Sequence, residues 1–219
     1  MKKIFALIAV ALLASGCAQA PYWTLSTDAN RVVPSTSFQF SVADGWVRTT
    51  KPRTWERIEI DGTRRTILLE GMTVTRDGTD LHAISVTRRY PDTAFPTVKK
   101  KSTANMLPPE VADLYVSELR KRTGLERLTV LSNKPATLDG KPGFQLVMQY
   151  KNDDGLRIQI MSYGFVDKTG FYTLTYRAPY LYFYDRDFKT FENLVGSFKQ
   201  LKGAFDPPPE IPAWAKIFT

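Results

Sequence analysis

The sequence of 219 residues contains one cysteine and one histidine. A single cysteine excludes a disulfide within the chain, and one residue of each type is too few for a Cys/His metal site. The sequence therefore predicts no metal and no cofactor. It also lacks the G-x-S-x-G, H-E-x-x-H, phosphate-loop and EF-hand patterns, and we expect no catalytic residues and no enzyme activity. The lone His82, followed by apolar residues, is expected to be structural.

The N-terminal segment has the features of an export signal. Lys2 and Lys3 precede an uncharged apolar run over 4–14, which is too short to cross a bilayer. The run ends in the sequence Leu-Ala-Ser-Gly-Cys at 13–17, which resembles the lipobox of bacterial lipoproteins. In that motif the cysteine is lipidated and becomes the new N-terminus. The sequence therefore predicts a lipid anchor on Cys17, and two or more acyl chains hold a protein stably on a membrane.

Two further features of this segment bear on the location of the protein. Cleavage after the A-x-A pattern at 18–20 would instead release a soluble protein, but the next residue is Pro21, which suits a scissile position poorly. Ala18 follows Cys17 where an Asp would resemble an inner-membrane retention signal. The prediction is a bacterial envelope lipoprotein on the outer membrane, facing the periplasm.

The formal net charge is +8. Removal of residues 1–16 takes away two lysines and no acidic residue, which leaves +6. Nucleic acid is not an expected partner of an exported protein, so the excess of positive charge indicates an anionic lipid, an anionic glycan or an acidic envelope protein.

The chain divides into four segments. Residues 1–16 are the predicted signal peptide, and 17–35 the lipidated N-terminus and a spacer. Residues 36–201 form one globular domain, and 202–219 a proline-rich tail that contains three consecutive prolines.

The domain combines strand and helix patterns. Phe38, Phe40 and Val42 alternate with polar residues, and Asp-Gly or Thr-Gly pairs separate the later β-rich segments, which indicates antiparallel pairing. Apolar residues at helical spacing predict two helices, over 107–124 and 185–198. The predicted fold class is α+β, with a central antiparallel β-sheet flanked by helices.

Two segments resemble the PsbP-like fold family, and in particular the bacterial DcrB-type exported lipoproteins. The first is the strand and tryptophan turn FQFSVADGW at 38–46. The second is FYTLTYRAP at 171–179, followed by a helix that ends in FENLVGSF at 191–198. The resemblance implies an α/β sandwich and a non-catalytic role, such as that of an assembly factor or adaptor.

Four arginines form one candidate anion-binding site. If Asp77-Gly78 is a two-residue hairpin turn, Arg88 and Arg89 face Ile67 and Thr66 on the preceding strand. Like charges at the open end of one hairpin repel unless an anion lies between them. The alternative is a solvated, basic strand edge that discourages strand addition. The proposed cluster consists of Arg64, Arg65, Arg88 and Arg89.

Aromatic residues form a second candidate site. Strand parity places Tyr163, Phe165, Tyr172 and Tyr176 on one face of the later sheet. A sheet with two apolar faces is covered on both, so a helix is expected over this face. If the cover is incomplete, the face becomes an apolar groove for a lipid or hydrophobic peptide.

The sequence therefore predicts a non-catalytic binding or assembly role at a bacterial membrane, with an envelope protein as the expected partner. A lipid or glycolipid carrier that uses the aromatic face is the alternative, and a hydrolase assembled from distant residues is a more remote one.

Overall fold

The computed structural model describes residues 22–27, 31–35, 37–60 and 62–201. Cys17, the signal peptide and the tail over 202–219 lie outside the described residues. None of the described helices is long and apolar enough to cross a membrane.

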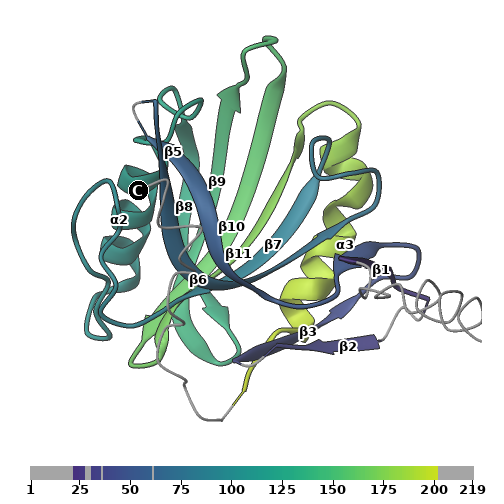
Figure 1. The fold of residues 1–219 in the computed structure, drawn as a ribbon, viewed down its shortest axis with the longest axis horizontal. Coiled ribbons are helices and arrows are strands. Elements are labelled where there is room, and N and C mark those ends of the chain that lie inside the picture. Colours follow the sequence, from purple (N-terminus) through teal and green to yellow (C-terminus); the bar gives the residue numbers. More distant parts are fainter. Residues whose placement is uncertain (1–21, 28–30, 36, 61, 202–219) are drawn as a thin grey trace, which may run out of the picture.

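Antiparallel strands dominate the described part of the chain, which contains two sheets and two helices (Figure 1). The large sheet has nine strands in the order β1-β4-β6-β7-β11-β10-β9-β8, with β5 paired to β6 beside β4, and the small sheet has the order β12-β3-β2. The elements are β1 (Trp23–Leu25), β2 (Arg31–Pro34), β3 (Phe38–Val42), β4 (Val47–Thr49), β5 (Arg53–Ile60), β6 (Thr63–Thr75), β7 (Ala83–Arg89), α2 (Pro108–Leu119), β8 (Thr129–Leu138), β9 (Lys141–Lys151), β10 (Arg157–Asp167), β11 (Gly170–Pro179), α3 (Phe183–Ser197) and β12 (Lys199–Gln200).

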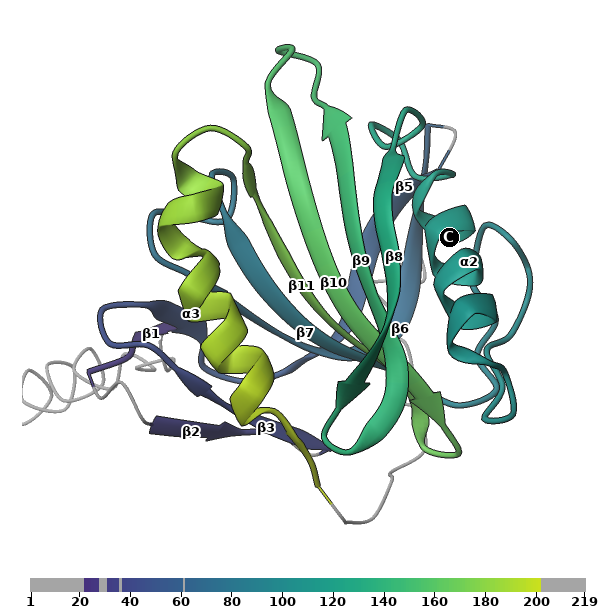
Figure 2. The same cartoon turned by 180° about the vertical axis from the view of Figure 1, so that it is seen from behind.

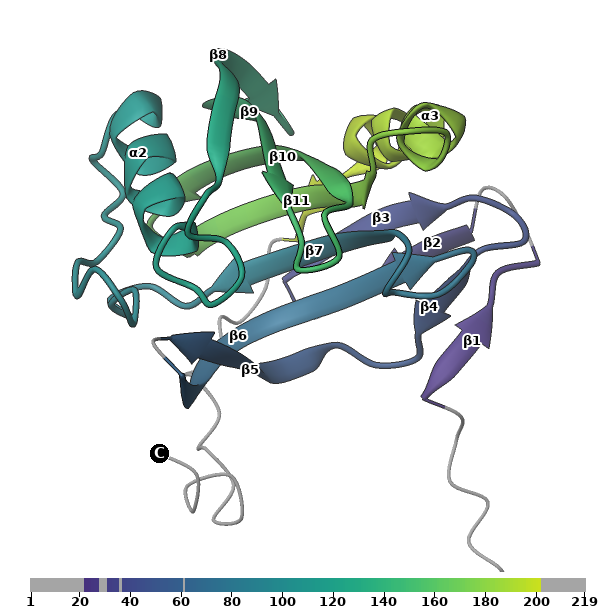
Figure 3. The same cartoon turned by 90° about the horizontal axis from the view of Figure 1, so that it is seen from above.

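The predicted fold class is confirmed, and the two helices lie on opposite sides of the large sheet (Figure 3). Figure 2 shows α3 running across the sheet beside β3. Pro108 stands in the first turn of α2, where its missing N–H costs nothing, and the Glu110 carboxylate accepts from the Leu107 N–H.

Each helix covers a separate apolar core. The core beneath α3 joins the helix residues Phe191 and Leu194 to Phe38 and Phe40 of β3 and to one face of the large sheet. The core beneath α2 lies on the other face, where the helix packs on β8, β9 and β10. The sheet is thus apolar on both faces near its middle, as its strand parity predicts.

The folded part begins earlier than predicted. Trp23–Leu25 pairs with β4, and Arg31–Pro34 pairs with β3, although both lie in the segment 17–35 that the sequence indicates as a spacer. Short strands without clear alternation carry little periodic signal, which is why the sequence does not reveal them.

Candidate functional site

Next to the part of the large sheet on which α2 packs, the same face of the sheet becomes more polar. One row across β6, β7 and β11 consists of Thr73, Ser85 and Thr175. Two residues further along β7, Thr87 lies opposite Thr173 of β11. The Thr87 and Thr173 hydroxyls are 2.6 Å apart. Three neighbouring strands therefore present a floor of five hydroxyl groups on one face, which we call the hydroxyl floor.

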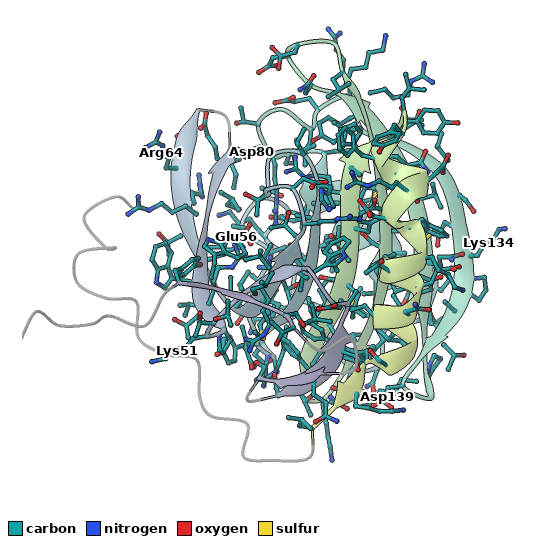
Figure 4. The ribbon with its side chains drawn as sticks, turned by 90° about the vertical axis from the view of Figure 1, so that its right-hand side faces the viewer. Lys51, Glu56, Arg64, Asp80, Lys134 and Asp139 are labelled. Atoms are coloured by element: carbon teal, nitrogen blue, oxygen red, sulfur yellow. The ribbon has the colours of Figure 1, made fainter. Side chains whose placement is uncertain are left out.

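The hydroxyl floor is the base of a cavity of about 490 Å³. Tyr115, Leu119 and Arg122, from α2 and the segment after it, line the cavity, and Arg53 and Glu56 of β5 also contribute to its lining. Figure 4 labels Glu56, which lies on β5 of the β5–β6 hairpin. The volume lies within the range of small-molecule sites.

Four arginines and one glutamate are the charged residues among those that line the cavity. Arg89 is the most deeply placed: its side chain is 7% exposed, and its guanidinium lies 4.3 Å from the centre of the Phe95 ring. Its Nη1, like the buried Nε atoms of Arg53 and Arg122, has no hydrogen-bond partner among the described residues. Arg177, by contrast, donates from Nη2 to the Thr79 carbonyl oxygen at 2.7 Å.

The surroundings of Arg89 make its positive charge less favourable than it is in water. Burial, reinforced by the positive charge of Arg122, lowers the pKa of Arg89 to about 10, while Glu118 and Glu56 act in the opposite direction. Glu118 accepts hydrogen bonds at Oε2 from the Thr97 side chain and N–H and from the Val98 N–H at 3.4 Å, while its Oε1 has no hydrogen-bond partner among the described residues. A buried charge is costly unless it is paired, so the cavity is complementary to an anion.

The predicted cluster of four arginines is wrong. Asp77-Gly78 lies within a seven-residue loop, 76–82, so β6 and β7 pair three residues out of the expected register and Arg88 lies opposite Glu70. Arg64 and Arg65 instead pair with β5 and are exposed; Figure 4 shows Arg64 at the outer end of the hairpin. Of the four, Arg89 alone lines the cavity.

Arg88 has a structural environment on the opposite face. Its Nη1 lies 3.6 Å from a carboxylate oxygen of Glu70, and its Nε donates to the Thr169 carbonyl oxygen at 2.9 Å. Glu70 also accepts hydrogen bonds from the Ser35 and Ser37 side chains and from the Ser37 N–H. Arg88 is therefore part of a buried hydrogen-bonded network.

The helix expected over the aromatic face is present, because α3 and β3 seal that face, and this excludes the alternative of an apolar groove. Phe165, Tyr172 and Tyr176 are buried, and the Phe191 ring lies 5.6 Å from that of Tyr176 and 6.0 Å from that of Tyr163. The Tyr176 hydroxyl donates to the Phe183 carbonyl oxygen at 2.8 Å. The parity that placed these four residues on one face is correct, and they form part of the core region beneath α3.

The structure also brings together Asp77, His82 and Asp187, whose potential ligand atoms all lie within 4.8 Å of one another. These atoms already have partners: Arg186 donates to both carboxylates, and the Arg76 N–H donates to His82 Nε2 at 3.3 Å. The positive charge of Arg186 also opposes a second cation. Sequence reasoning missed this group because Asp187 lies on α3, far along the chain from the other two.

A sequence signal for the cavity exists. Hydroxyl residues alternate in three strands: Thr73 and Thr75, Ser85 and Thr87, and Thr173 and Thr175. The apolar half of this alternation predicts the strands, and the hydroxyl half marks the cavity face. The pairing of β7 with β11 then places the second and third pairs side by side.

No family model matches the sequence. No curated protein matches it either. Among solved structures, the chain is similar to cyanobacterial PsbP from Synechocystis sp. PCC 6803, with 9% identity over 85% of this chain and 96% of that chain, and a TM-score of 0.49. It is also similar to LpqN of Mycobacterium tuberculosis, which is described as involved in cell envelope biogenesis, with 15% identity over 86% and 88% of the two chains and a TM-score of 0.35. The relation to DcrB-type lipoproteins stays a prediction.

Proposed function

We propose that the protein is a bacterial envelope lipoprotein, anchored through Cys17, that binds an anionic ligand in the cavity without transforming it. The observation that carries the proposal is the side chain of Arg89, whose Nη1 is buried at the cavity without a described partner. Arg53 and Arg122 add two further buried Nε donors at the same cavity. Guanidinium groups bind phosphate and carboxylate through directed hydrogen bonds, so this set is complementary to such a group.

Binding fits the lining better than catalysis does. The charged groups are four arginines and one glutamate, and the hydroxyls of Thr87 and Thr173 are hydrogen-bonded to each other. A set of fixed donors holds an anion in place, whereas proton transfer requires an acid or base whose pKa lies near the working pH. We retain an envelope protein as an expected partner of the outer surface, and the membrane as the partner of the lipid anchor.

The aromatic-face carrier is not pursued, since α3 closes that face. The ligand site moves to the opposite face of the same sheet, where the cavity lies.

Isothermal titration with phenyl phosphate tests the proposal. We expect saturable one-to-one binding that weakens as salt is raised, because charge pairing dominates the contact. The variant Arg89→Met should raise the Kd at least tenfold, since it removes the buried donor but keeps an apolar side chain over Phe95. The control Arg64→Met removes an exposed arginine at the hairpin end and should leave the Kd within twofold.

Thermal unfolding of both variants shows whether each is folded. An Arg89→Met protein that is folded and binds phenyl phosphate as well as the wild type would contradict the proposal. The anchor is tested separately: Cys17→Ser should leave an unprocessed chain that metabolic labelling with an alkyne fatty acid no longer marks.

A further inference from the structure

The hydroxyl floor indicates what kind of group is attached to the anionic group of the ligand. On the cavity face, four residues of β7 lie opposite four residues of β11. The pairs, in order, are Arg89 with Phe171, Thr87 with Thr173, Ser85 with Thr175, and Ala83 with Arg177. The hydroxyl groups therefore occupy the middle of a strip with an arginine at either end. Six residues of strand separate the rows of Arg89 and Arg177, a length of about 20 Å.

A hydrocarbon chain is a poor occupant of the middle of this strip. Each hydroxyl has one donor and two acceptor positions, so the pair Thr87 and Thr173 satisfies only part of its capacity by its mutual hydrogen bond. The same holds for Thr175, whose hydroxyl lies 3.0 Å from that of Ser162 and 3.4 Å from that of Tyr115. Covering these groups with an acyl chain would remove water without replacing its hydrogen bonds, which is unfavourable.

A sugar or another polyol is a better match. Its hydroxyl groups both donate and accept, as the floor groups do, and each can replace a water molecule. Neighbouring strands lie about 4.8 Å apart, so the floor residues are carried at a backbone spacing on the scale of one sugar ring. The rings of Tyr115 and Phe171, whose centroids are 5.6 Å apart, belong to the same lining and offer apolar contact for the C–H groups of a polyol.

The anionic group of such a ligand has a defined place. Arg89 lies opposite Phe171 and against Phe95, at the end of the floor beyond Thr87 and Thr173, and Arg122 is near enough to shift the pKa of Arg89. Arg177 at the other end is already engaged with the Thr79 carbonyl oxygen. The anion is therefore expected beside Arg89, with the polyol extending over the threonines.

We infer that the ligand is a phosphorylated sugar or polyol, with its phosphate at Arg89 and Arg122 and its hydroxyl groups on Thr87, Thr173 and Thr175. This inference rests on the proposed function, which requires only that the cavity binds an anion. The same chemistry occurs in soluble sugar phosphates and in the head groups of phosphorylated glycolipids.

Three probes with a common phosphate separate the inference from the proposed function. Glucose 1-phosphate carries phosphate and hydroxyl groups, hexyl phosphate carries phosphate and an alkyl chain, and inorganic phosphate carries neither addition. Titrated into the purified protein, glucose 1-phosphate should bind at least tenfold more tightly than either of the others. Hexyl phosphate binding as tightly or more tightly would overturn the polyol inference while leaving the anion site intact. Failure of all three probes to bind would overturn both.

Variants of the floor test the contacts themselves. Thr87→Val and Thr175→Val each replace a hydroxyl by a methyl group of similar size. Each should weaken glucose 1-phosphate binding at least fivefold and leave hexyl phosphate binding within twofold. The control Thr137→Val removes an exposed hydroxyl on β8 and should change neither Kd. An unchanged preference for glucose 1-phosphate in both floor variants would contradict the inference.

A competition experiment distinguishes the two sources of the ligand. Phosphatidylcholine vesicles with and without phosphatidylinositol are added to the protein loaded with glucose 1-phosphate. Displacement only by vesicles that contain the inositol lipid supports a membrane head group as the source of the polyol phosphate. Retention of glucose 1-phosphate with both kinds of vesicle supports a soluble one.

Discussion

Arg88 and Arg89 are neighbours in β7, yet they lie in opposite kinds of environment because successive side chains of a strand point to opposite faces. Arg88 is paired with Glu70 within the closed core region on the α3 side. Arg89 lies at the cavity, where its Nη1 has no described partner. On one face of the sheet the chain itself supplies a partner for the buried arginine. On the other face the buried arginine is left complementary to an anionic ligand.

This difference follows from what covers each face. On the α3 side, the helix and β3 together bring aromatic rings over the sheet and leave the tyrosines buried. On the other side, α2 packs mainly on β8, β9 and β10, and the face of β6, β7 and β11 next to it carries the hydroxyl floor among its apolar residues. If the cavity binds the proposed anion, stability and ligand binding belong to different faces of one sheet, and perturbing each face in turn tests this division.

The largest effect on stability is expected from opening the sealed face. Phe191 is 0% exposed and its ring packs on Tyr163 and Tyr176, so Phe191→Ala leaves a cavity in the core. We expect a loss of about 4 kcal/mol in the free energy of unfolding. Urea unfolding followed by tryptophan fluorescence measures it, with Lys189→Ala on the exposed surface of α3 as the control. A loss below about 1 kcal/mol would show that α3 does not seal this face tightly.

Replacing Arg88, which is paired with Glu70, should lower the free energy of unfolding by a smaller amount. Replacing its neighbour Arg89 should leave the free energy of unfolding unchanged or raise it. Arg88→Met leaves Glu70 buried without its cation, which should cost about 3 kcal/mol. The value lies at the lower end of the usual range because Ser35 and Ser37 still donate to Glu70. Arg89→Met removes a buried charge with an unpartnered donor, so the stability of the ligand-free protein should be unchanged or rise by up to about 1 kcal/mol.

The same urea experiment, applied to both variants, compares the two faces directly. Equal destabilisation by Arg88→Met and Arg89→Met would mean that both arginines hold the fold together. The cavity would then lose its distinguishing feature, and the proposed anion site would lose its main support.

The sequence predicts the sealed face better than the cavity. Alternation in the strands and helical spacing in 185–198 are local signals. They are enough to predict the fold class and the shared face of Tyr163, Phe165, Tyr172 and Tyr176. The cavity depends on pairings between distant strands, such as Thr87 with Thr173, which are 86 residues apart. It also depends on the register of β6 and β7, which the loop over 76–82 shifts by three residues through side-chain contacts that no turn motif reveals.

The smallest effect concerns His82, which lies fully buried beside Trp46, with ring centroids 5.0 Å apart. Burial lowers the pKa of His82, and Arg186 and Arg76 act in the same direction, against the opposing influence of Asp187 and Asp77. Its folded-state pKa therefore lies below the ordinary value of 6.5, so the unfolded chain binds the proton more readily.

The contribution of His82 to stability is therefore complete above about pH 6.5 and is lost as the pH falls below that value. The lowered pKa values of Asp77, Asp139 and Asp167 act in a separate window, because their contribution is lost only as the pH falls below about 4. The temperature of the thermal unfolding midpoint should consequently decrease when the pH is lowered from 7.5 to 5.5, roughly one unit either side of the ordinary histidine pKa. The variant His82→Gln should make this decrease smaller, even if it lowers the midpoint temperature at every pH. Arg89, with a pKa of about 10, stays protonated throughout this range. Phosphate itself gains a proton at about pH 6, so the comparison uses phenyl sulfate, which keeps one negative charge. Its binding should not follow the pH dependence of stability, and a shared dependence would indicate that the two faces are coupled rather than separate.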